Sequence, residues 1–324
     1  MPYAIAAAGP GGPEQLRRID FAPPAPGAGE VLVRHTAIGV NYIDIYFRSG
    51  LYPWPQERDL VPGCEAAGVV ETVGDGVREF EPGARVAYVA ANGAYATHRV
   101  VSAAQLVALP DLVEDSIAAG AMLKGLTAYY LIHDSAPVSD GDTVLFHAAA
   151  GGVGLIAGQW LAAKGVRAIG TAGGPEKCAL ARANGYGDVI DYRSEDFVER
   201  VRALTGGAGV KAVYDGVGAE TILGSAECLA NFGTLVSFGQ SSGAPDQFRI
   251  SHLARGSLRL TRPTLFHFTA ERGWLERASA ALFDAIRAGE VRLHIGKRRP
   301  LVEAAAAHAD LEGRVTTGST VLVP

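Results

Sequence analysis

The stretch Phe146-His-Ala-Ala-Ala-Gly-Gly-Val-Gly154 decides the fold of this chain, because an apolar strand runs into a glycine-rich turn that opens a helix. The preceding residues 142–146 are typical of a buried strand, and residues 154–164 are typical of a helix. The spacing Ala149-x-Gly151-x-x-Gly154 is a variant of the G-x-G-x-x-G pattern. Without Cβ atoms, the backbone N–H groups of such a turn approach phosphate oxygens closely, and the helix N-terminus adds partial positive charge. We therefore expect this corner to hold the diphosphate of a dinucleotide.

The residues after the turn strengthen this interpretation, because they alternate between strand and helix patterns. We expect strands at 142–147, 166–171, 188–191, 210–214 and 232–238, and helices at 152–164, 175–184, 195–204 and 219–230. Such alternation indicates an α/β fold with a doubly wound parallel sheet and helices on both of its faces.

The first third of the chain has a different pattern, with short strand-like runs at 31–40, 68–74, 84–90 and 95–101. Prolines and glycines separate these runs, which is typical of a compact β-barrel domain. The last part of the chain has helical patterns at 270–288 and 304–312 and a strand at 319–323. We expect it to return to the first domain.

Composition limits the possible functions. The 324 residues suggest about two domains. A net charge of −5 offers no bulk basic field, which argues against nucleic acid as a partner. Three cysteines without a C-x-x-C spacing, and a start without a basic signal region, indicate a cytoplasmic protein. Residues 143–163 carry no formal charge, but the glycine turn divides them, so we expect a buried βα unit and no membrane span.

Several motifs in order along the chain resemble the medium-chain dehydrogenase/reductases, and among them the NADPH:quinone oxidoreductase, or zeta-crystallin, family. The residues that carry the resemblance are Gly39-Val-Asn-Tyr-Ile-Asp44, Arg48-Ser-Gly-Leu-Tyr52, Pro62-Gly-Cys-Glu-Ala-Ala-Gly68, Lys124-Gly-Leu-Thr-Ala-Tyr129, residues 146–154, Val213-Tyr-Asp215 and Val236-Ser-Phe-Gly239. The resemblance implies a GroES-like substrate domain, residues 1–122 and 263–324, and a Rossmann NADPH-binding domain, residues 123–262. It also implies a zinc-independent enzyme that passes a hydride from NADPH to a quinone.

The second strand of the βα series bears on the choice of cofactor. NAD-binding folds carry an acidic residue about 20 positions after the glycine turn, which binds the ribose. Here the strand runs into Ala172-Gly-Gly-Pro-Glu-Lys177, so its tip offers glycines and Lys177 can meet a 2′-phosphate. The resemblance supports Gly174, Lys177 and Tyr192 in that role, and we expect NADPH. Without the resemblance, Glu176 and Lys177 would be explained equally well as charged, solvent-exposed residues at the start of a helix.

The positions that bind zinc in related dehydrogenases are occupied by Asn41 and Cys64 here. A catalytic zinc needs about three protein ligands, so we expect no metal. The acceptor should then be one whose reduction needs little electrophilic help, such as a quinone or an activated enone.

The resemblance assigns Asn41, Tyr46 and Tyr52 to the catalytic site, where tyrosines suit a planar acceptor. From the sequence alone, Tyr42, Tyr46 and Tyr52 could simply pack a helix and a loop. A proton could come from Tyr46, Tyr52 or water. We expect Thr127 to open a helical run. The expected cofactor-binding residues are Asn41, Thr127, Gly151, Gly152, Val153, Gly173, Gly174, Lys177, Tyr192, Phe238, Gly239, Ser241 and Arg314.

Two other functions stay open at this point. A reductase of α,β-unsaturated aldehydes or ketones would share the fold, the cofactor and the metal-free chemistry. An NADPH-binding, crystallin-like or RNA-associated protein is the alternative outside enzymes, which the acidic balance disfavours. The strand-like run 257–261 would lie at the edge of the Rossmann sheet, and we expect a homodimer through it, without excluding a tetramer.

Overall fold

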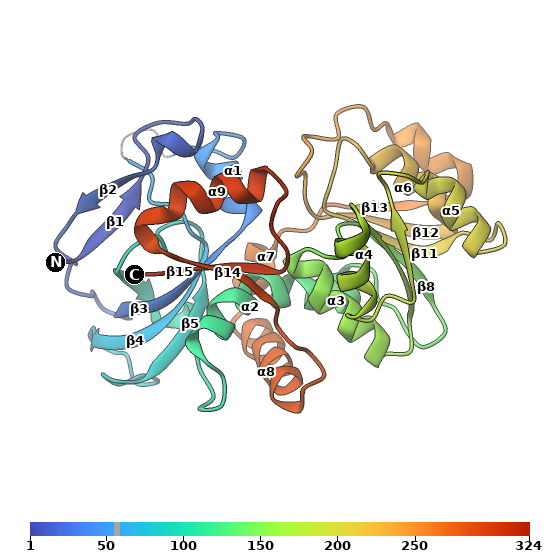
Figure 1. The fold of residues 1–324 in the computed structure, drawn as a ribbon. Helices are drawn as coiled ribbons and strands as arrows, with labels where there is room; N and C mark the ends of the chain where they lie inside the picture. The colour runs from blue at the N-terminus through green and yellow to red at the C-terminus, as the bar shows by residue number, and fades with distance from the viewer. Residues whose placement is uncertain (55–58) are drawn as a thin grey trace. The chain divides into compact units, whose positions relative to one another are not determined.

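A computed structural model describes residues 1–54 and 59–324, which divide into two compact units (Figure 1). Unit 1 comprises Met1–Leu126, Phe266–Ala288 and Leu293–Pro324. Unit 2 comprises Thr127–Leu265 and Gly289–Arg292. Both chain termini therefore belong to unit 1.

Unit 2 is built on a six-stranded sheet in the order β10-β9-β8-β11-β12-β13. Every strand pair in it is parallel. The strands are β8 (Thr143–Phe146), β9 (Arg167–Ala172), β10 (Asp188–Asp191), β11 (Val210–Asp215), β12 (Leu229–Ser237) and β13 (Arg259–Thr261). The chain runs outward from β8 to one edge and then returns to β11 to build the other half. This order is that of the Rossmann fold and confirms the expected doubly wound parallel sheet.

Four helices cover the two faces of this sheet. In Figure 1, α3 (Gly152–Ala163) and α4 (Pro175–Arg182) lie on one face, and α5 (Phe197–Leu204) and α6 (Ile222–Cys228) lie on the other. Buried aliphatic side chains of the central strands and of α5 and α6 form the core between them, among them Leu145, Ile169, Val201, Val213 and Ile222.

The expected boundaries differ from the structure at α6. The helical pattern predicted a helix that ends at residue 230, but α6 ends at Cys228. The helix stops there because β12 begins at Leu229 without an intervening loop. Leu229 is 5% exposed and pairs with Val210 of β11. Burial and sheet pairing of this residue therefore outweigh its helical propensity.

Unit 1 contains a seven-stranded sheet with β14-β15-β3-β4-β5-β7 in order and β6 paired to β3. Only β14 and β15 pair in parallel. The strands are β3 (Glu30–Val40), β4 (Glu65–Val73), β5 (Arg85–Val89), β6 (His98–Ser102), β7 (Leu106–Ala108), β14 (Ile295–Pro300) and β15 (Ser319–Val323). A separate antiparallel pair is formed by β1 (Tyr3–Ala6) and β2 (Arg17–Asp20).

The run at 95–101 was expected to be one strand, but β6 begins only at His98. Tyr95 instead accepts the amide of Ile5 at 2.8 Å and donates its own amide to Pro62 at 2.9 Å. The backbone of Tyr95 is therefore occupied by two loop contacts, and the strand starts later.

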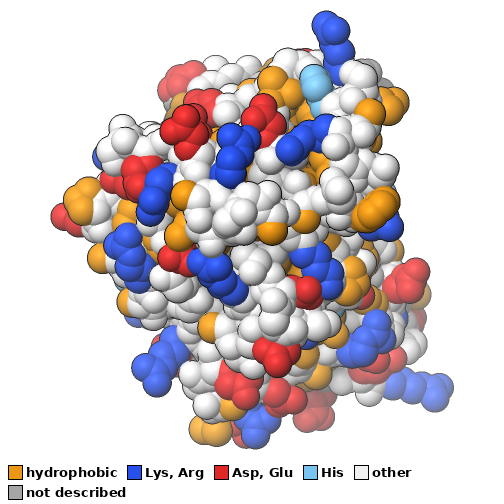
Figure 2. All heavy atoms as spheres, turned by 90° about the vertical axis from the view of Figure 1, so that its right-hand side faces the viewer, with side chains coloured by type: hydrophobic (Ala, Val, Ile, Leu, Met, Phe, Trp, Pro, Cys, Tyr) orange, Lys and Arg blue, Asp and Glu red, His pale blue; other side chains and the backbone are white. Residues whose placement is uncertain are grey.

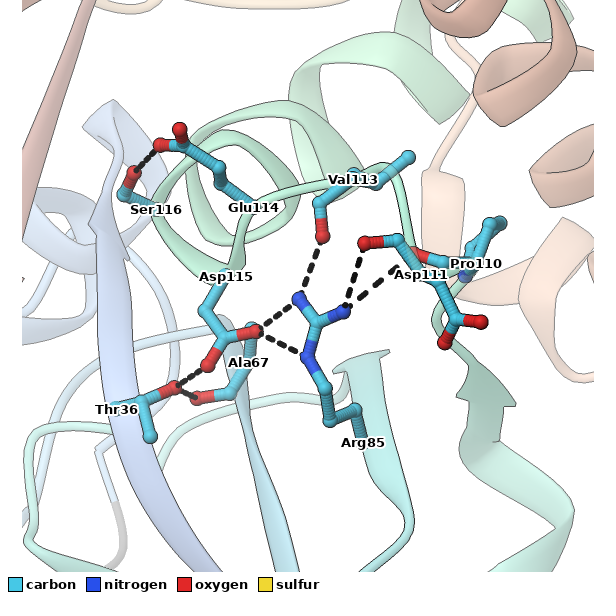
Figure 3. A network of polar contacts seen from close by, with 9 residues as sticks. All are labelled: Thr36, Ala67, Arg85, Pro110, Asp111, Val113, Glu114, Asp115 and Ser116. Carbon is cyan, nitrogen blue, oxygen red and sulfur yellow. Dashed lines mark hydrogen bonds and ion pairs between the residues drawn. The ribbon is translucent and has the colours of Figure 1, made fainter.

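Helix α2 (Asp115–Tyr130) begins at a network of polar contacts in unit 1 (Figure 3). Asp115 accepts a hydrogen bond from Arg85 Nε at 3.0 Å and one from the Thr36 hydroxyl at 2.6 Å. The same guanidinium donates to the Val113 carbonyl. These contacts from β3 and β5 fix the start of the helix that carries Lys124. Thr127 lies in the last turn of α2, so the expectation that it opens a helical run was wrong.

The remaining α-helices of the described residues are α1 (Tyr42–Arg48), α7 (Leu265–Thr269), α8 (Arg272–Ala288) and α9 (Ala304–Glu312). Among residues 1–54 and 59–324, no helix is long and apolar enough to cross a membrane. The uncharged stretch 143–163 divides into β8, the glycine turn and α3.

Candidate functional site

The glycine turn of unit 2 lies at the carboxyl end of β8. Gly151 is the N-cap residue of α3, and no side chain caps this helix. A Cβ atom on Gly154 would lie 2.5 Å from the carbonyl oxygen of Ala148 and 2.7 Å from that of Ala149. Only glycine fits at Gly154, which lets the first turn of α3 pack tightly against the strand. The amides at the start of an uncapped helix are suited to bind an anion.

Directly beneath this turn, His147 belongs to a buried network that the sequence did not indicate. The Ser225 hydroxyl donates to Asp215 Oδ2 at 2.7 Å, so its oxygen accepts the hydrogen bond from His147 Nε2 at 2.9 Å. His147 Nδ1 then accepts from the Thr171 hydroxyl at 2.9 Å. Burial lowers the pKa of His147, which keeps the ring neutral. The network ties the ends of β8, β9 and β11 together.

The tip of β9 gathers basic and aromatic groups. A Cβ atom on Gly173 would lie 2.5 Å from the hydroxyl of Tyr192, and one on Gly174 would lie 3.2 Å from the guanidinium of Arg193. Lys177 lies in the first turn of α4, which starts directly after Gly174. Gly174 has a φ of +92°, a conformation that favours glycine. The structure thus brings Gly173, Gly174 and Tyr192 together.

Arg193 was missed from the sequence, although it directly follows Tyr192. The sequence could have indicated Arg193, because the residue before it was already expected at the site and follows the end of a strand. The carboxylate of Asp191 is also close to the tip, but its Oδ1 accepts the backbone amides of Gly174 at 2.9 Å and Arg193 at 3.1 Å. These backbone N–H groups lower the pKa of Asp191.

The loop after β12 contains three further expected residues. Phe238 donates its amide to the carbonyl of Asp215 at 2.9 Å, and its ring lies 5.8 Å from that of Phe146. Gly239 is buried, and Ser241 donates its amide to Gly216 at 3.3 Å. The loop is therefore held against the ends of β8 and β11.

In unit 1, Asn41 and Lys124 meet at one buried carboxylate. Glu65 Oε1 accepts a hydrogen bond from Asn41 Nδ2 at 2.8 Å and one from Lys124 Nζ at 2.8 Å. Glu65 Oε2 accepts the backbone amide of Leu123 at 2.6 Å. Glu65 is fully buried, and Asn41 and Lys124 are 5% and 6% exposed. The side chains come from the start of α1, from β4 and from α2. Neither Glu65 nor Lys124 was chosen from the sequence.

A second buried group adjoins this cluster. Asp44 Oδ2 accepts the backbone amide of Asn41 at 2.9 Å and the hydroxyl of Tyr95 at 3.2 Å. Tyr95 also bonds with His308 Nε2 at 2.9 Å. Burial raises the pKa of Asp44 to about 7 and lowers that of His308 to about 3. Burial also raises the pKa of the Cys64 thiol, so this sulfur is not a thiolate at neutral pH.

The expected tyrosines form a small aromatic cluster around α1. The ring of Tyr46 lies 5.3 Å from that of Tyr52, and the amide of Tyr52 donates to the carbonyl of Tyr46 at 2.9 Å. The ring of Tyr42 lies 6.2 Å from that of Tyr46, and its hydroxyl donates to Leu311 at 2.8 Å. Tyr46 and Tyr52 therefore lie together, and both also take part in packing.

Among the expected residues, Asn41, Tyr46, Tyr52 and Arg314 belong to unit 1, and the others belong to unit 2. Arg314 has a φ of +54° in the loop between α9 and β15. In the part of the chain that the structure describes, no three His, Cys, Asp or Glu residues are arranged to hold a metal ion.

Comparisons with known proteins agree with this architecture. A family model described as zinc-binding dehydrogenase matches residues 152–279, and one described as alcohol dehydrogenase GroES-like domain matches residues 27–111. A quinone oxidoreductase of Pseudomonas aeruginosa is 47% identical over 316 residues, which are 97% of this chain and 97% of that protein. The chain belongs to the quinone oxidoreductase family. This confirms the resemblance drawn from the motifs and the GroES-like and Rossmann fold class.

Two further members of this family are informative. The crystal structure of Escherichia coli quinone oxidoreductase complexed with NADPH superimposes with a TM-score of 0.96 at 43% identity, covering 99% of this chain and 100% of that one. A 2-haloacrylate reductase of Burkholderia is 44% identical over 322 residues, covering 97% of this chain and 96% of that protein. The family thus includes proteins named for two kinds of acceptor.

Proposed function

We propose that this protein is a zinc-independent NADPH:quinone oxidoreductase, in which residues 123–262 bind NADPH and residues 1–122 and 263–324 bind the acceptor. The observation that carries the proposal is the tip of β9, where Tyr192 and Arg193 adjoin Gly173 and Gly174, and Lys177 lies in the first turn of the helix that follows. Two cationic side chains and a phenol there match a phosphate on the adenosine ribose. The crystal structure of the Escherichia coli quinone oxidoreductase complexed with NADPH supports the same cofactor for this protein.

The residues of unit 2 fit the rest of the dinucleotide. The amides at the start of α3 would bind the diphosphate, and the loop after β12 would contact the nicotinamide half. When bound, NADPH supplies a hydride, which carries two electrons. The proposed cofactor-binding residues are Asn41, Thr127, Gly151, Gly152, Val153, Gly173, Gly174, Lys177, Tyr192, Arg193, Phe238, Gly239, Ser241 and Arg314.

Asn41, Tyr46 and Tyr52 are proposed to orient a flat acceptor in unit 1. The proposal of zinc independence is supported by the contacts of Glu65, whose Oε1 atom is occupied by the Lys124 ammonium and the Asn41 amide. A metal ion beside this cluster would meet an ammonium group and an amide in place of ligands.

NADPH oxidation measured with a benzoquinone, a naphthoquinone, an enal and 2-chloroacrylate tests the proposal. We expect the quinones to give the highest kcat/KM. The 44% identity to 2-haloacrylate reductase favours reduction of an activated alkene as the second candidate, and a faster reaction with 2-chloroacrylate or the enal would support it.

The alternative of an RNA-associated protein finds little support in the surface charge. In the face drawn in Figure 2, Lys and Arg side chains are interspersed with Asp and Glu. Nucleic acid binding depends on clustered positive charge. A salt-dependent gel shift on RNA, together with no NADPH oxidation with any acceptor, would favour the alternative.

A homodimer through β13 and a cytoplasmic location are further parts of the proposal. β13 is the last strand of its sheet, and Leu260 on it is 42% exposed. An exposed apolar edge favours pairing with a second copy. We expect Leu260→Lys to halve the mass measured by light scattering, and an unchanged mass would contradict this interface. The three cysteines are buried and unpaired, as in proteins of reducing compartments.

A further inference from the structure

In the cluster of Glu65, Asn41 and Lys124, the Lys124 ammonium group has more hydrogen-bond donors than it uses. An ammonium group has three N–H donors. Lys124 uses one of them on Glu65, and no other acceptor for it lies among the residues that the structure describes. Lys124 is 6% exposed, so its charge is partly withdrawn from water. A ligand oxygen beside Asn41 would therefore meet a cation that still has donors to offer.

Glu65 holds this cation in a fixed position. Its carboxylate is fully buried, and it is bound on Oε2 by the amide of Leu123, the residue preceding Lys124 on α2. Glu65 also packs against Gly39, where any Cβ atom would collide with Oε1. The start of the same helix is anchored by Asp115 and Arg85 (Figure 3). Both ends of the ion pair are therefore positioned before any ligand binds.

Reduction of a quinone creates negative charge that needs such a group. The acceptor gains a hydride, with its two electrons, and becomes a hydroquinone monoanion, which one proton from water converts to the neutral hydroquinone. Tyr46 and Tyr52 offer only neutral hydroxyl groups. A preorganised cation at the developing oxyanion lowers the barrier much more than a neutral donor does.

We propose that Lys124 is a further catalytic residue, whose ammonium group donates a hydrogen bond to the acceptor oxygen on which negative charge develops. The inference rests on the proposed function, since it assigns a role within the same acceptor site. It also restricts the substrates to acceptors that become an oxyanion on reduction, such as quinones and conjugated carbonyl compounds.

The alternative role for Lys124 is only to neutralise Glu65. Two variants separate these roles. Lys124→Met leaves the buried carboxylate without its cation, and we expect it to be less thermally stable and slow. The double variant Lys124→Met/Glu65→Gln removes both charges, and we expect it to recover most of the melting temperature of the cofactor-free protein. We expect its kcat to stay about 100-fold below that of the wild type.

Recovery of both the melting temperature and kcat in the double variant would overturn the proposal, because charge balance alone would then explain Lys124. Lys211→Met is the matched control. Lys211 also pairs with a carboxylate, that of Asp142, but it is 47% exposed in unit 2. This variant should keep both properties.

A titration without NADPH gives an independent test. 4-Nitrophenol serves as a probe for a hydroquinone-like oxyanion, and its ionised form is followed by absorbance. We expect the wild-type protein to make the bound phenol about ten times more acidic and the double variant to lose this effect. Equal acidity of the probe on both proteins would overturn the proposal. Absence of quinone-dependent NADPH oxidation by the wild type would instead refute the proposed function, whatever the probe shows.

Discussion

The carboxylate of Asp191 accepts a hydrogen bond from the backbone amide of Gly174 at 2.9 Å, which holds the loop at the tip of β9 in place. Its Oδ1 atom also accepts the amide of Arg193. This carboxylate is directed at the backbone, Tyr192 and Arg193 lie beside the glycines of the tip, and Lys177 lies in the first turn of α4. The arrangement suits a phosphate better than a ribose hydroxyl.

We predict that Lys177→Met and Arg193→Met each weaken NADPH binding by about tenfold to a hundredfold and leave NADH binding nearly unchanged. A charge-assisted hydrogen bond contributes about 1.5–3 kcal/mol, and NADH lacks the phosphate that would receive it. The measurement is the dissociation constant of each nucleotide by fluorescence titration. Arg200→Met, which removes an arginine paired with Glu195 in the same unit, is the control. An equal loss of affinity for NADPH and for NADH would show that these cations do not bind the phosphate.

Gly154→Ala should impair both stability and nucleotide binding. The new Cβ atom would lie 2.5 Å from a backbone oxygen that cannot move without distorting the turn. We expect a loss of about 1–3 kcal/mol in the free energy of unfolding and weaker NADPH binding. Gly187→Ala is the matched control, because no atom lies within 4 Å of its added Cβ. If the two variants bind NADPH equally well, the turn does not hold the dinucleotide.

Tyr52→Phe should lower kcat about two- to tenfold with a quinone, while NADPH affinity is unchanged. The variant keeps the ring that packs on Tyr46 and removes the hydroxyl, whose proposed neutral hydrogen bond to the acceptor would contribute about 0.5–1.5 kcal/mol. Steady-state kinetics with saturating NADPH measures the effect, with Tyr3→Phe as the control. An unchanged kcat would remove the Tyr52 hydroxyl from the reaction.

The contribution of His35 to stability should fall as the pH falls below 6.5, because burial favours the neutral ring in the native protein. Burial lowers the pKa of His35 from 6.5 to about 3, and the ring is bound by the Ala96 carbonyl at 2.7 Å and the Tyr88 hydroxyl at 2.9 Å. The unfolded chain takes up a proton near pH 6.5 and the native chain does not. The stability contributed by the neutral His35 is therefore fully present above pH 6.5 and is lost as the pH falls toward 3.

Each such histidine contributes a slope of at most about 1.4 kcal/mol per pH unit. We expect His35→Gln to reduce the slope of the unfolding free energy between pH 7 and pH 5, measured by urea denaturation. His267→Gln, at an exposed position, should not change it. The same slope in His35→Gln and the wild type would contradict a neutral buried His35.

The fold was largely predictable because its signals are local. The apolar strand, the glycine corner and the following helix at 142–164 are adjacent in sequence, and the repeat of this unit implies a parallel sheet. The boundaries at α6 and β6 were not predictable, since Leu229 and Tyr95 are fixed by partners distant in the chain.

The candidate site was predictable only in part, because several of its contacts join residues that are distant in the chain. Gly173, Gly174 and Tyr192 follow strand ends that a Rossmann pattern brings together. Glu65 and Lys124 lie 59 residues apart, and no spacing rule joins them. The network of His147, Ser225 and Asp215 likewise joins side chains from separate elements, which only the packed sheet brings into contact.

Isothermal titration calorimetry of the wild-type protein with NADPH and with NADH tests the central claim most directly. The account predicts one site per chain that binds NADPH with a dissociation constant in the micromolar range or tighter, and NADH at least about tenfold more weakly. No heat of binding with NADPH, or equal affinity for the two nucleotides, would contradict it.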